Sequence, residues 1–456
     1  LDRVNGLPPK VSLAALVIDN DALEVLAYAG SADFNDRERA AHVDMVRGVR
    51  SPGSTLKPFL YAMALDEGLV HSESLLIDAP QSFGGYQPGN FQASFSGPVS
   101  VSEALQKSLN VPAVDLLDRV GPARFASQLR AAGIRLRMAR GVEPNLSLIL
   151  GGAGTTLEEL VGGYRALARA GLAGRPRLQP EEPRIESRLM SEGAAFIVRD
   201  ILEGGGHPDR PFVEGARGLA WKTGTSFGFR DAWAVGVTGR HTIGVWVGRP
   251  DGTPNPGFFG ANTAAPLLQD IASALQEPAS AARTPPVTVS RSLICWPMGM
   301  RKEATPPEQC LSQRTAWLLQ GTSPPTLPDR YRTGGLLVMC QPGRPHVRWP
   351  AALAPWVREA DCRAPSQDSQ LRIEGLDAGA LLKPVPGHPQ VSVTVSAAGA
   401  ASPSDRLYWL LDGVQVRRAM AREAVTLNLD TAGLHALTLL DETGRFQRIE
   451  FRLAAP

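Results

Sequence analysis

Predicted β-strands lie at both ends of residues 1–280, and predicted helices lie between them. Residues 12–30 contain two apolar runs that are separated by a polar turn at residues 19–21. Leu219–Thr225 and Ala232–Val247 are predicted as adjacent strands, with turn residues between them. A sheet in this part of the chain must therefore be assembled from segments far apart in the sequence. This layout predicts an α+β domain.

The helices between these strands are marked by their first turns. Ser100-x-x-Glu103 and Thr155-x-x-Glu158 match the capping box, in which a Ser or Thr and a Glu three residues later satisfy free N–H groups at a helix start. They predict two helices, of which the second runs through Arg169. Further helices are predicted over Phe59–Leu65, Leu189–Leu202 and Thr263–Leu275.

Residues 281–370 differ in composition from the part before them. They hold 13 of the 38 prolines and all four cysteines, so we expect a poorly regular connecting region. The cysteine spacing matches no zinc motif. Two disulfides with three possible pairings would fit an oxidising compartment, and free buried thiols are the alternative. The cysteines are Cys295, Cys310, Cys340 and Cys362.

Residues 371–456 consist of short runs that alternate apolar and polar residues, such as residues 390–395 and a final hairpin from His435 to Leu453. Short alternating strands with Asp-Gly and Thr-Gly turns predict a small antiparallel sandwich, which we expect to be immunoglobulin-like. The predicted domains are thus residues 1–280, residues 281–370 and residues 371–456.

Charge and hydropathy exclude several classes of partner. The formal net charge is +2 with both signs spread along the chain, which argues against a nucleic-acid-binding surface. No apolar run approaches the ~20 residues of a membrane helix. The chain starts at Leu1 without an initiator Met or a signal peptide, so we expect a fragment of a longer protein. No histidine or cysteine motif for a metal is present, and we predict no metal and no cofactor.

The first chemical motif is Ser54-x-x-Lys57, which follows a Pro-Gly turn. Residues three apart share one face of a helix, so the two side chains can meet. A serine hydroxyl needs a base to act as a nucleophile, and a lysine whose pKa is lowered by burial can be that base. Six of the 47 basic residues are lysines, so a retained lysine hints at an amine that must lose its proton, which arginine cannot do.

Two further motifs follow at a distance, and they make the first one specific. Ser108-Leu109-Asn110 comes after the helix that starts at Ser100, and Lys222-Thr223-Gly224-Thr225 ends a predicted strand. Each motif is common by itself. The three in this order match a signature of penicillin-binding proteins and class A β-lactamases, whose middle motif is Ser-Asp-Asn where this chain has Leu109.

The signature assigns a catalytic role to four residues. Ser54 is the predicted nucleophile and Lys57 the predicted base. Ser108 is predicted to relay a proton between the amine and the leaving group, and Lys222 to supply positive charge near this path and near a substrate carboxylate.

The predicted substrate-binding residues are Asn110, Thr223, Gly224 and Thr225. We expect Asn110 to hold an amide, Thr225 to bind a carboxylate, and Gly224 to let a substrate backbone approach the strand. The backbone N–H groups of Ser54 and Thr225 are the predicted oxyanion hole.

Two local features predict departures from ideal geometry. Pro58 has no N–H to donate to the Ser54 carbonyl, so the first helical turn must be irregular. Strand alternation places Lys222 and Thr225 on opposite faces. A twist or bulge near Gly224 is therefore needed if both residues serve one pocket.

A competing motif overlaps the third one. Residues 224–228 match the Gly-x-Ser-x-Gly nucleophile elbow, which requires a strand, a sharp turn and then a helix. Residues 232–237 are predicted as a strand, so we disfavour the elbow.

On these motifs, residues 10–280 resemble the transpeptidase domain of class A penicillin-binding proteins. Residues 89–99, residues 104–113 and the run from Leu150 to Glu158 are also similar to that family around its motifs. The tail, with residues 409–413 and a terminal strand, is similar to the C-terminal domain of the penicillin-binding protein 1C type.

The resemblance implies a five-stranded antiparallel sheet with helices on both sides. It implies a serine D,D-transpeptidase on the periplasmic side of the bacterial inner membrane, which cross-links peptidoglycan stem peptides and is acylated by β-lactam antibiotics. Family members carry a membrane anchor and a glycosyltransferase domain, which this sequence lacks, so we expect cross-linking without glycan polymerisation. Family context also suggests an envelope partner for the C-terminal domain, such as a bacterial α-macroglobulin.

Three other functions compete with this one. A D,D-carboxypeptidase differs in admitting water to the acyl-enzyme. A β-lactamase-like hydrolase needs a water-activating base, and Glu143-Pro144-Asn145 is the candidate, although a surface glutamate is the simpler reading. A non-catalytic β-lactam-binding scaffold would act through the C-terminal domain, but the intact Ser54, Lys57 and Lys222 argue against lost chemistry.

Overall fold

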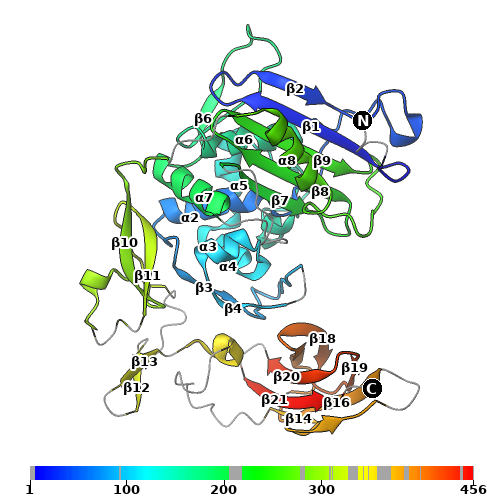
Figure 1. Ribbon diagram of the computed structural model, residues 1–456, viewed down its shortest axis with the longest axis vertical. Coiled ribbons are helices and arrows are strands. Elements are labelled where there is room, and N and C mark those ends of the chain that lie inside the picture. The colour runs from blue at the N-terminus through cyan, green and yellow to red at the C-terminus, as the bar shows by residue number, and fades with distance from the viewer. Residues whose placement is uncertain are drawn as a thin grey trace.

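The computed structural model shows a large mixed domain, a connecting hairpin region and a C-terminal sandwich along the chain (Figure 1). The structure describes residues 6–91, 94–204, 218–277, 283–307, 310, 312–326, 337–341, 344–347, 349–356, 371–384, 390–400, 402–441 and 445–454.

A five-stranded antiparallel sheet forms the centre of the first domain, in the order β2-β1-β9-β8-β7. β1 (Ser12–Asp19) pairs with β2 (Val25–Ala29) and, from the far end of the domain, with β9 (His241–Gly248). β8 (Asp231–Val237) joins β9 to β7 (Ala220–Thr225), which lies at the sheet edge. The predicted assembly from distant segments is confirmed.

Helices cover both faces of this sheet. α8 (Ala264–Ala274) packs Leu268 against one face. α2 (Lys57–Asp66), α6 (Leu157–Tyr164) and α7 (Glu192–Gly204) belong to the main apolar core on the other face. α2 is buried along nearly its whole length, as expected of a helix that is apolar on all sides and lies at the centre of a domain.

The predicted helix starts are correct in one case and shifted in the other. Ser100 and Glu103 form the expected capping box of α3 (Val101–Gln106). The second box is formed by Thr156 and Glu159, one residue later than predicted. Thr155 pairs its backbone with Arg50 instead, and this extended pairing keeps it out of the helix.

Several predicted boundaries also move. α6 ends at Tyr164 and continues as the 3-10 turn η4 (Arg165–Leu167), so the regular helix is shorter than predicted. The stretch from Ala232 to Val247 contains both β8 and β9. The other elements of this domain are α4 (Asn110–Val120), α5 (Pro122–Ala131), β3 (Leu75–Asp78), β4 (Gly97–Ser100), β5 (Leu172–Gly174), β6 (Glu186–Arg188), η1 (Arg37–Arg39), η2 (Gly53–Leu56) and η3 (Leu146–Leu150).

The connecting region is more regular than the sequence predicts. β10 (Val289–Trp296) and β11 (Ser312–Leu319) form a continuous antiparallel hairpin. Prolines lie outside the paired residues of β10 and β11, where a proline would remove a ladder hydrogen bond, whereas the short strand β13 contains Pro345. The region also contains η5 (Lys302–Ala304), β12 (Leu337–Gln341), β13 (Arg344–Val347) and η8 (Ala351–Trp356).

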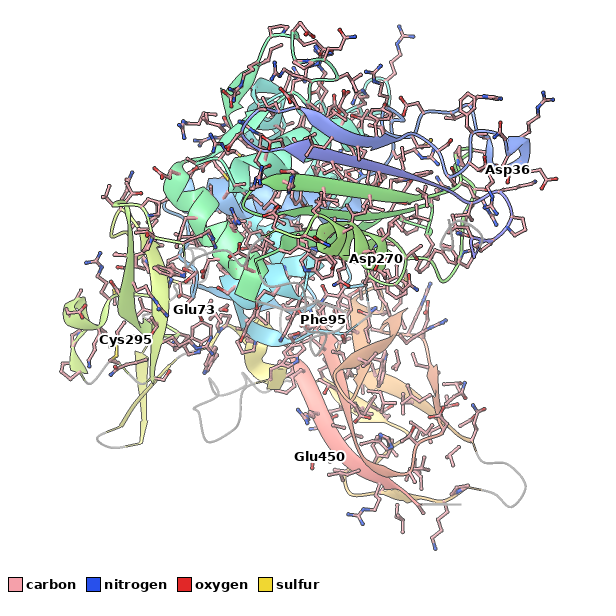
Figure 2. All side chains as sticks on the ribbon, turned by 45° about the horizontal axis from the view of Figure 1, so that its top comes forward. Asp36, Glu73, Phe95, Asp270, Cys295 and Glu450 are labelled. Atoms are coloured by element: carbon pink, nitrogen blue, oxygen red, sulfur yellow. A yellow bond between two sulfur atoms is a disulfide. The ribbon has the colours of Figure 1, made fainter. Side chains whose placement is uncertain are left out.

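One disulfide closes the loop at the end of this hairpin. Cys295 of β10 bonds to Cys310, which confirms a disulfide for two of the four cysteines. Cys295 lies on the hairpin at one side of the main domain (Figure 2). Cys362 and the side chain of Cys340 lie outside the described residues, so the second predicted pair is untested.

The C-terminal domain consists of two facing sheets, as predicted. One has the order β14-β16-β19 and the other β15-β21-β20-β17-β18. Trp409, Leu439 and Phe451 lie in the apolar core between them. The strands are β14 (Arg372–Glu374), β15 (Leu381–Leu382), β16 (Val391–Ala398), β17 (Arg406–Leu411), β18 (Val414–Met420), β19 (Val425–Leu429), β20 (Gly433–Asp441) and β21 (Phe446–Leu453).

Within the described residues, none of the helices has the length and apolar character needed to cross a membrane. The same residues contain no cluster of histidine, cysteine and acidic side chains that could hold a metal ion.

The disulfide yields a stability prediction. Cys295 and Cys310 are 15 residues apart, and closing a loop of that length stabilises a fold by about 3 kcal/mol through the unfolded chain. We expect the Cys295→Ser/Cys310→Ser double variant to lose up to this amount, measured by urea unfolding and by proteolysis of the hairpin. Ser290→Ala, an exposed change on the same hairpin, is the control. Equal proteolysis of both variants would contradict the prediction.

A histidine on β20 yields a pH prediction. His435 bonds through Nδ1 to Asp412 and through Nε2 to Thr431 O, and the Asp412 side chain raises the pKa of His435. The folded state therefore favours the imidazolium, and this stabilisation is complete below about pH 6.5 and lost as the pH rises through the raised pKa. We expect the stability difference between wild type and His435→Gln to shrink between pH 6 and pH 8.5 in thermal melts. A constant difference would refute this.

Candidate acylation site

Ser54 lies at the start of the central helix, in an irregular turn. The 3-10 turn η2 (Gly53–Leu56) precedes α2, and the Lys57 N–H donates to Ser54 O. Pro58 cannot donate to that carbonyl, so the shorter hydrogen bond takes the place of a regular helical one. This confirms the predicted irregularity and places Ser54 and Lys57 one turn apart.

Lys57 is fully buried and points its amine at the second motif. Its Nζ donates to Ser108 O at 2.6 Å, to Leu109 O at 3.0 Å and to Asn110 Oδ1 at 2.7 Å. A buried ammonium is unfavourable unless oxygens surround it. The bend between α3 and α4 therefore provides the oxygen atoms that stabilise the buried amine of Lys57.

Ser108 occupies the bend and lies between two amines. Its backbone φ is +57°, a left-handed conformation that a non-glycine residue adopts at a cost of about 1–2 kcal/mol. Its Oγ accepts a hydrogen bond from Lys222 Nζ at 2.7 Å and lies 3.5 Å from Lys57 Nζ. A hydroxyl in this position can pass a proton between its neighbours.

Lys222 reaches this hydroxyl from the edge strand β7. It is buried, and its Nζ also donates to Thr223 O at 3.1 Å. The structure thus brings together Lys57, Ser108, Asn110 and Lys222 from three separate segments, as the motifs predict.

Strand β7 touches the nucleophile turn through backbone atoms. A Cβ on Gly53, which has φ +53°, would overlap the Thr225 carbonyl oxygen and lie 2.7 Å from Thr225 N. A Cβ on Gly224 would overlap Pro52 O. Glycine at both positions is therefore required for the strand and the turn to meet. The structure gives Gly224 this packing role, in addition to the predicted approach of a substrate.

The bulge that the sequence suggests near Gly224 is not formed. β7 pairs with β8 in continuous register from Ala220 to Thr225. The side chains of Lys222 and Thr225 consequently leave the strand on opposite faces. Thr225 Oγ1 accepts a hydrogen bond from Gly260 N at 3.0 Å. Its binding of a carboxylate stays a prediction, as does the substrate role of its neighbour Thr223.

The structure adds two residues that motif reasoning missed. Asn90 Oδ1 accepts a hydrogen bond from Asn110 N at 2.8 Å, and Asn90 Nδ2 donates to Asp78 Oδ1 at 2.7 Å. Asp78 is fully buried, and burial raises its pKa, while Asn90, Ser96 and the charge of Lys57 oppose that rise. Gly89-Asn90 is noticeable in the sequence only through the family resemblance. No sequence signal marks Asp78.

The two rival motifs have structural explanations. Glu143 is exposed, and Asn145 uses its side chain to cap η3 by accepting from Ser147 N. Ser226, the centre of the possible nucleophile elbow, is buried and accepts a hydrogen bond from Asp231 N at the start of β8. A strand follows it, so the elbow prediction is excluded, as expected.

Comparisons with known proteins identify the families that this chain resembles. Family models match three parts of the chain: a penicillin binding protein transpeptidase domain at residues 13–272, a penicillin-binding protein 1C linker domain at residues 288–318, and a penicillin-binding protein C-terminus family at residues 360–451.

Individual relatives support the same grouping. Penicillin-binding protein 1C of Escherichia coli is 42% identical over 98% of this chain, which spans 61% of that relative. Among solved structures, penicillin-binding protein 1A of Haemophilus influenzae superposes with a TM-score of 0.57 at 20% identity, over 70% of this chain and 55% of that one. The PonA1 protein of Mycobacterium tuberculosis in complex with penicillin V gives 0.53 at 23% identity, over 62% and 83%. These superpositions show the fold.

The contact between the turn and the strand can be tested with two glycines. Gly53 and Gly84 have similar positive φ angles of +53° and +58°, but a Cβ on Gly84 has no atom within 4 Å. We expect Gly84→Ala to cost about 1–2 kcal/mol from backbone strain. Gly53→Ala should cost about 2 kcal/mol more, because it also drives the turn away from β7. Urea unfolding measures both. Similar losses would mean that the turn and strand do not need this contact.

Proposed function

The chain belongs to the penicillin-binding protein family, and we propose that it is a serine D,D-transpeptidase that cross-links peptidoglycan stem peptides through an acyl-enzyme on Ser54. The observation that carries this proposal is the placement of Ser108 Oγ between the amines of Lys57 and Lys222. Lys57 in turn lies one helical turn after Ser54. An enzyme that acylates a serine needs such a path for the serine proton.

In the acylation step, Lys57 accepts the proton of Ser54 while Ser54 Oγ attacks the carbonyl carbon of the penultimate D-Ala. The tetrahedral oxyanion is held by the backbone N–H groups of Ser54 and Thr225. In support, the Thr225 backbone lies directly beside Gly53. The peptide C–N bond then breaks, and the proton passes from Lys57 through Ser108 to the nitrogen of the leaving D-Ala.

In the second step, an amine of a neighbouring stem peptide attacks the ester carbonyl. The new peptide bond forms as the ester C–O bond breaks, the amine loses a proton to the Lys57 and Ser108 path, and Ser54 Oγ regains its own. Water in place of the amine would give a D,D-carboxypeptidase. A β-lactam enters at the same serine and leaves an ester after its ring opens.

We assign substrate binding to the predicted residues. Asn110 bonds to Lys57 and to Gly89 O through its amide, so it can hold both the base and a substrate amide. Lys222 supplies positive charge for the substrate carboxylate, and Thr223, Gly224 and Thr225 line the edge of β7 along which the stem peptide would lie.

The remaining assignments follow the family. We place the activity on the periplasmic side of the inner membrane and divide the chain into residues 1–280 for acyl transfer, residues 281–370 as connection and residues 371–456 as the C-terminal domain. The proposed chemistry uses no metal or cofactor. A protein partner of the C-terminal domain, such as a bacterial α-macroglobulin, stays a prediction.

Benzylpenicillin tests the proposal by intact-mass spectrometry and peptide mapping. We expect wild type to carry a lasting penicilloyl group on Ser54, and Ser54→Ala to carry none. Lys57→Arg should be acylated about a thousandfold more slowly, because arginine keeps the charge but cannot accept the proton. Lys107→Arg, an exposed change beside Ser108, is the matched control and should behave as wild type.

The outcomes separate the proposal from two of the three alternatives, because a D,D-carboxypeptidase would be acylated in the same way. Drug consumed without a lasting adduct would identify a β-lactamase-like hydrolase. Drug left intact by wild type would identify a non-catalytic protein. Equal acylation of wild type and Lys57→Arg would overturn the assignment of Lys57 as the base.

A further inference from the structure

The C-terminal domain packs against the segment that leads into the second motif. Phe95, 6% exposed, lies in one apolar cluster with Tyr408 and Leu440 of the sandwich. Val111, which follows Asn110 in the first turn of α4, belongs to the same cluster and is fully buried. The sandwich therefore supports the helix that presents Asn110, and is more than an appended module.

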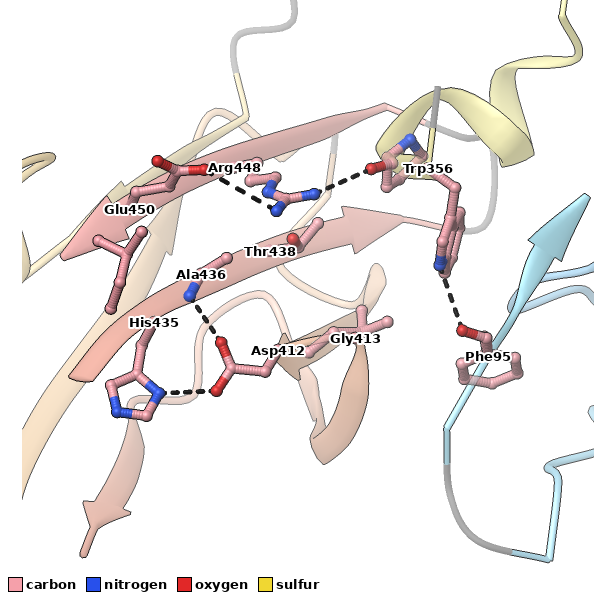
Figure 3. A pocket seen from close by; sticks show the side chains of 12 residues that line it. Phe95, Trp356, Asp412, Gly413, His435, Ala436, Thr438, Arg448 and Glu450 are labelled. Carbon is pink, nitrogen blue, oxygen red and sulfur yellow. Dashed lines mark hydrogen bonds and ion pairs between the residues drawn. The ribbon is translucent and has the colours of Figure 1, made fainter. Parts of the chain in front are cut away.

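Hydrogen bonds fix this junction at Phe95. Phe95 N donates to Gly413 O at 3.4 Å. Trp356 Nε1 donates to Phe95 O at 3.2 Å (Figure 3). Arg448 of β21 donates to Pro355 O and so ties η8 to the sandwich. A cavity of about 490 Å³ opens beside these contacts.

A continuous path leads from this junction to the base. Ser96, next to Phe95, donates its N–H to Asp78 Oδ2 at 2.7 Å. Asp78 accepts from Asn90, Asn90 accepts from Asn110 N, and Asn110 Oδ1 accepts from Lys57 Nζ, at 2.7, 2.8 and 2.7 Å. Each of these hydrogen bonds is partly buried, although Ser96 itself is exposed, so a shift at one end changes the hydrogen bonding of the next group.

We propose that the C-terminal domain is a positioning element of the acylation site, which holds Asn110 and Lys57 in place through Phe95 and Val111. The inference rests on the proposed function. It identifies Phe95 and Asn90 as positioning residues, which act through Asn110 and do not touch the substrate.

Strand alternation supplies a matched pair of variants. Leu439 and Leu440 are adjacent on β20, and both are fully buried. Leu439 faces the core between the two sheets of the sandwich, whereas Leu440 faces the junction with Phe95 and Val111. The same Leu→Ala truncation at the two positions removes equal volume from the sandwich interior and from the junction.

The experiment measures acylation of the whole chain by a fluorescent penicillin over a range of drug concentrations, which separates the rate constant of acylation from the affinity of the initial complex. We expect Leu440→Ala to lower the rate constant about tenfold, a typical coupling through a contact network, with little change in affinity. The rate constant of acylation of Leu439→Ala should stay within about twofold of wild type, even if this variant lowers the Tm as much as Leu440→Ala does. Leu440→Met, which keeps the volume, should restore the rate.

Two further variants distinguish a loss of positioning from a loss of folding. Trp356→Phe keeps an aromatic ring, although a smaller one, and removes the N–H bonded to Phe95 O. Asn90→Ala breaks the path nearer Lys57. Both should slow acylation at an unchanged melting profile of the main domain. If wild type is not acylated, the proposed function fails. If wild type is acylated, two results would refute the positioning role. In the first, Leu440→Ala, Trp356→Phe and Asn90→Ala are acylated with the rate constant of wild type. In the second, Leu439→Ala lowers that rate constant as much as Leu440→Ala does.

Discussion

Two buried lysine amines that share one serine hydroxyl set the geometry of the acylation site. Lys57 and Lys222 are almost fully buried, and a buried amine needs oxygen partners. The bend at Ser108 supplies them, but only with a left-handed backbone at that residue. Helix α2, the bend and strand β7 must therefore lie at fixed distances from one another. The close contacts of Gly53 and Gly224 hold strand β7 against η2.

A second layer of residues supports this arrangement from farther away. Asp78 and Asn90 hold the start of α4, and they lie on a segment that continues to Phe95 and to the C-terminal sandwich. The proposed catalytic residues are polar, whereas the junction that supports them is apolar. This division suits the chemistry, because apolar packing can fix a helix without adding charges that would disturb the proton path.

Much of the fold and most of the site follow from local patterns. The strands at both ends of the first domain, the cap at Ser100 and the sandwich strands are marked by periodicity or by turn residues, which act over a few positions. Three local features differ between the sequence prediction and the structure. The cap at Thr155 moved by one residue because Arg50 pairs with it, and the hairpin of β10 and β11 is regular because its prolines lie outside the paired residues. The bulge near Gly224 was expected to bring Thr225 into the pocket, but the β-ladder with β8 stays in register.

The sequence by itself determined which residues we propose for the chemistry: Ser54, Lys57, Ser108 and Lys222 are recognisable from residue type, spacing and order. The tertiary structure decided how they are held. Asp78, Asn90 and the junction at Phe95 became apparent only in three dimensions, because their partners lie up to hundreds of positions away and no short-range pattern records such a contact. Local propensity determines which segments form helices and strands. Packing between distant segments determines which buried polar groups form hydrogen bonds with one another.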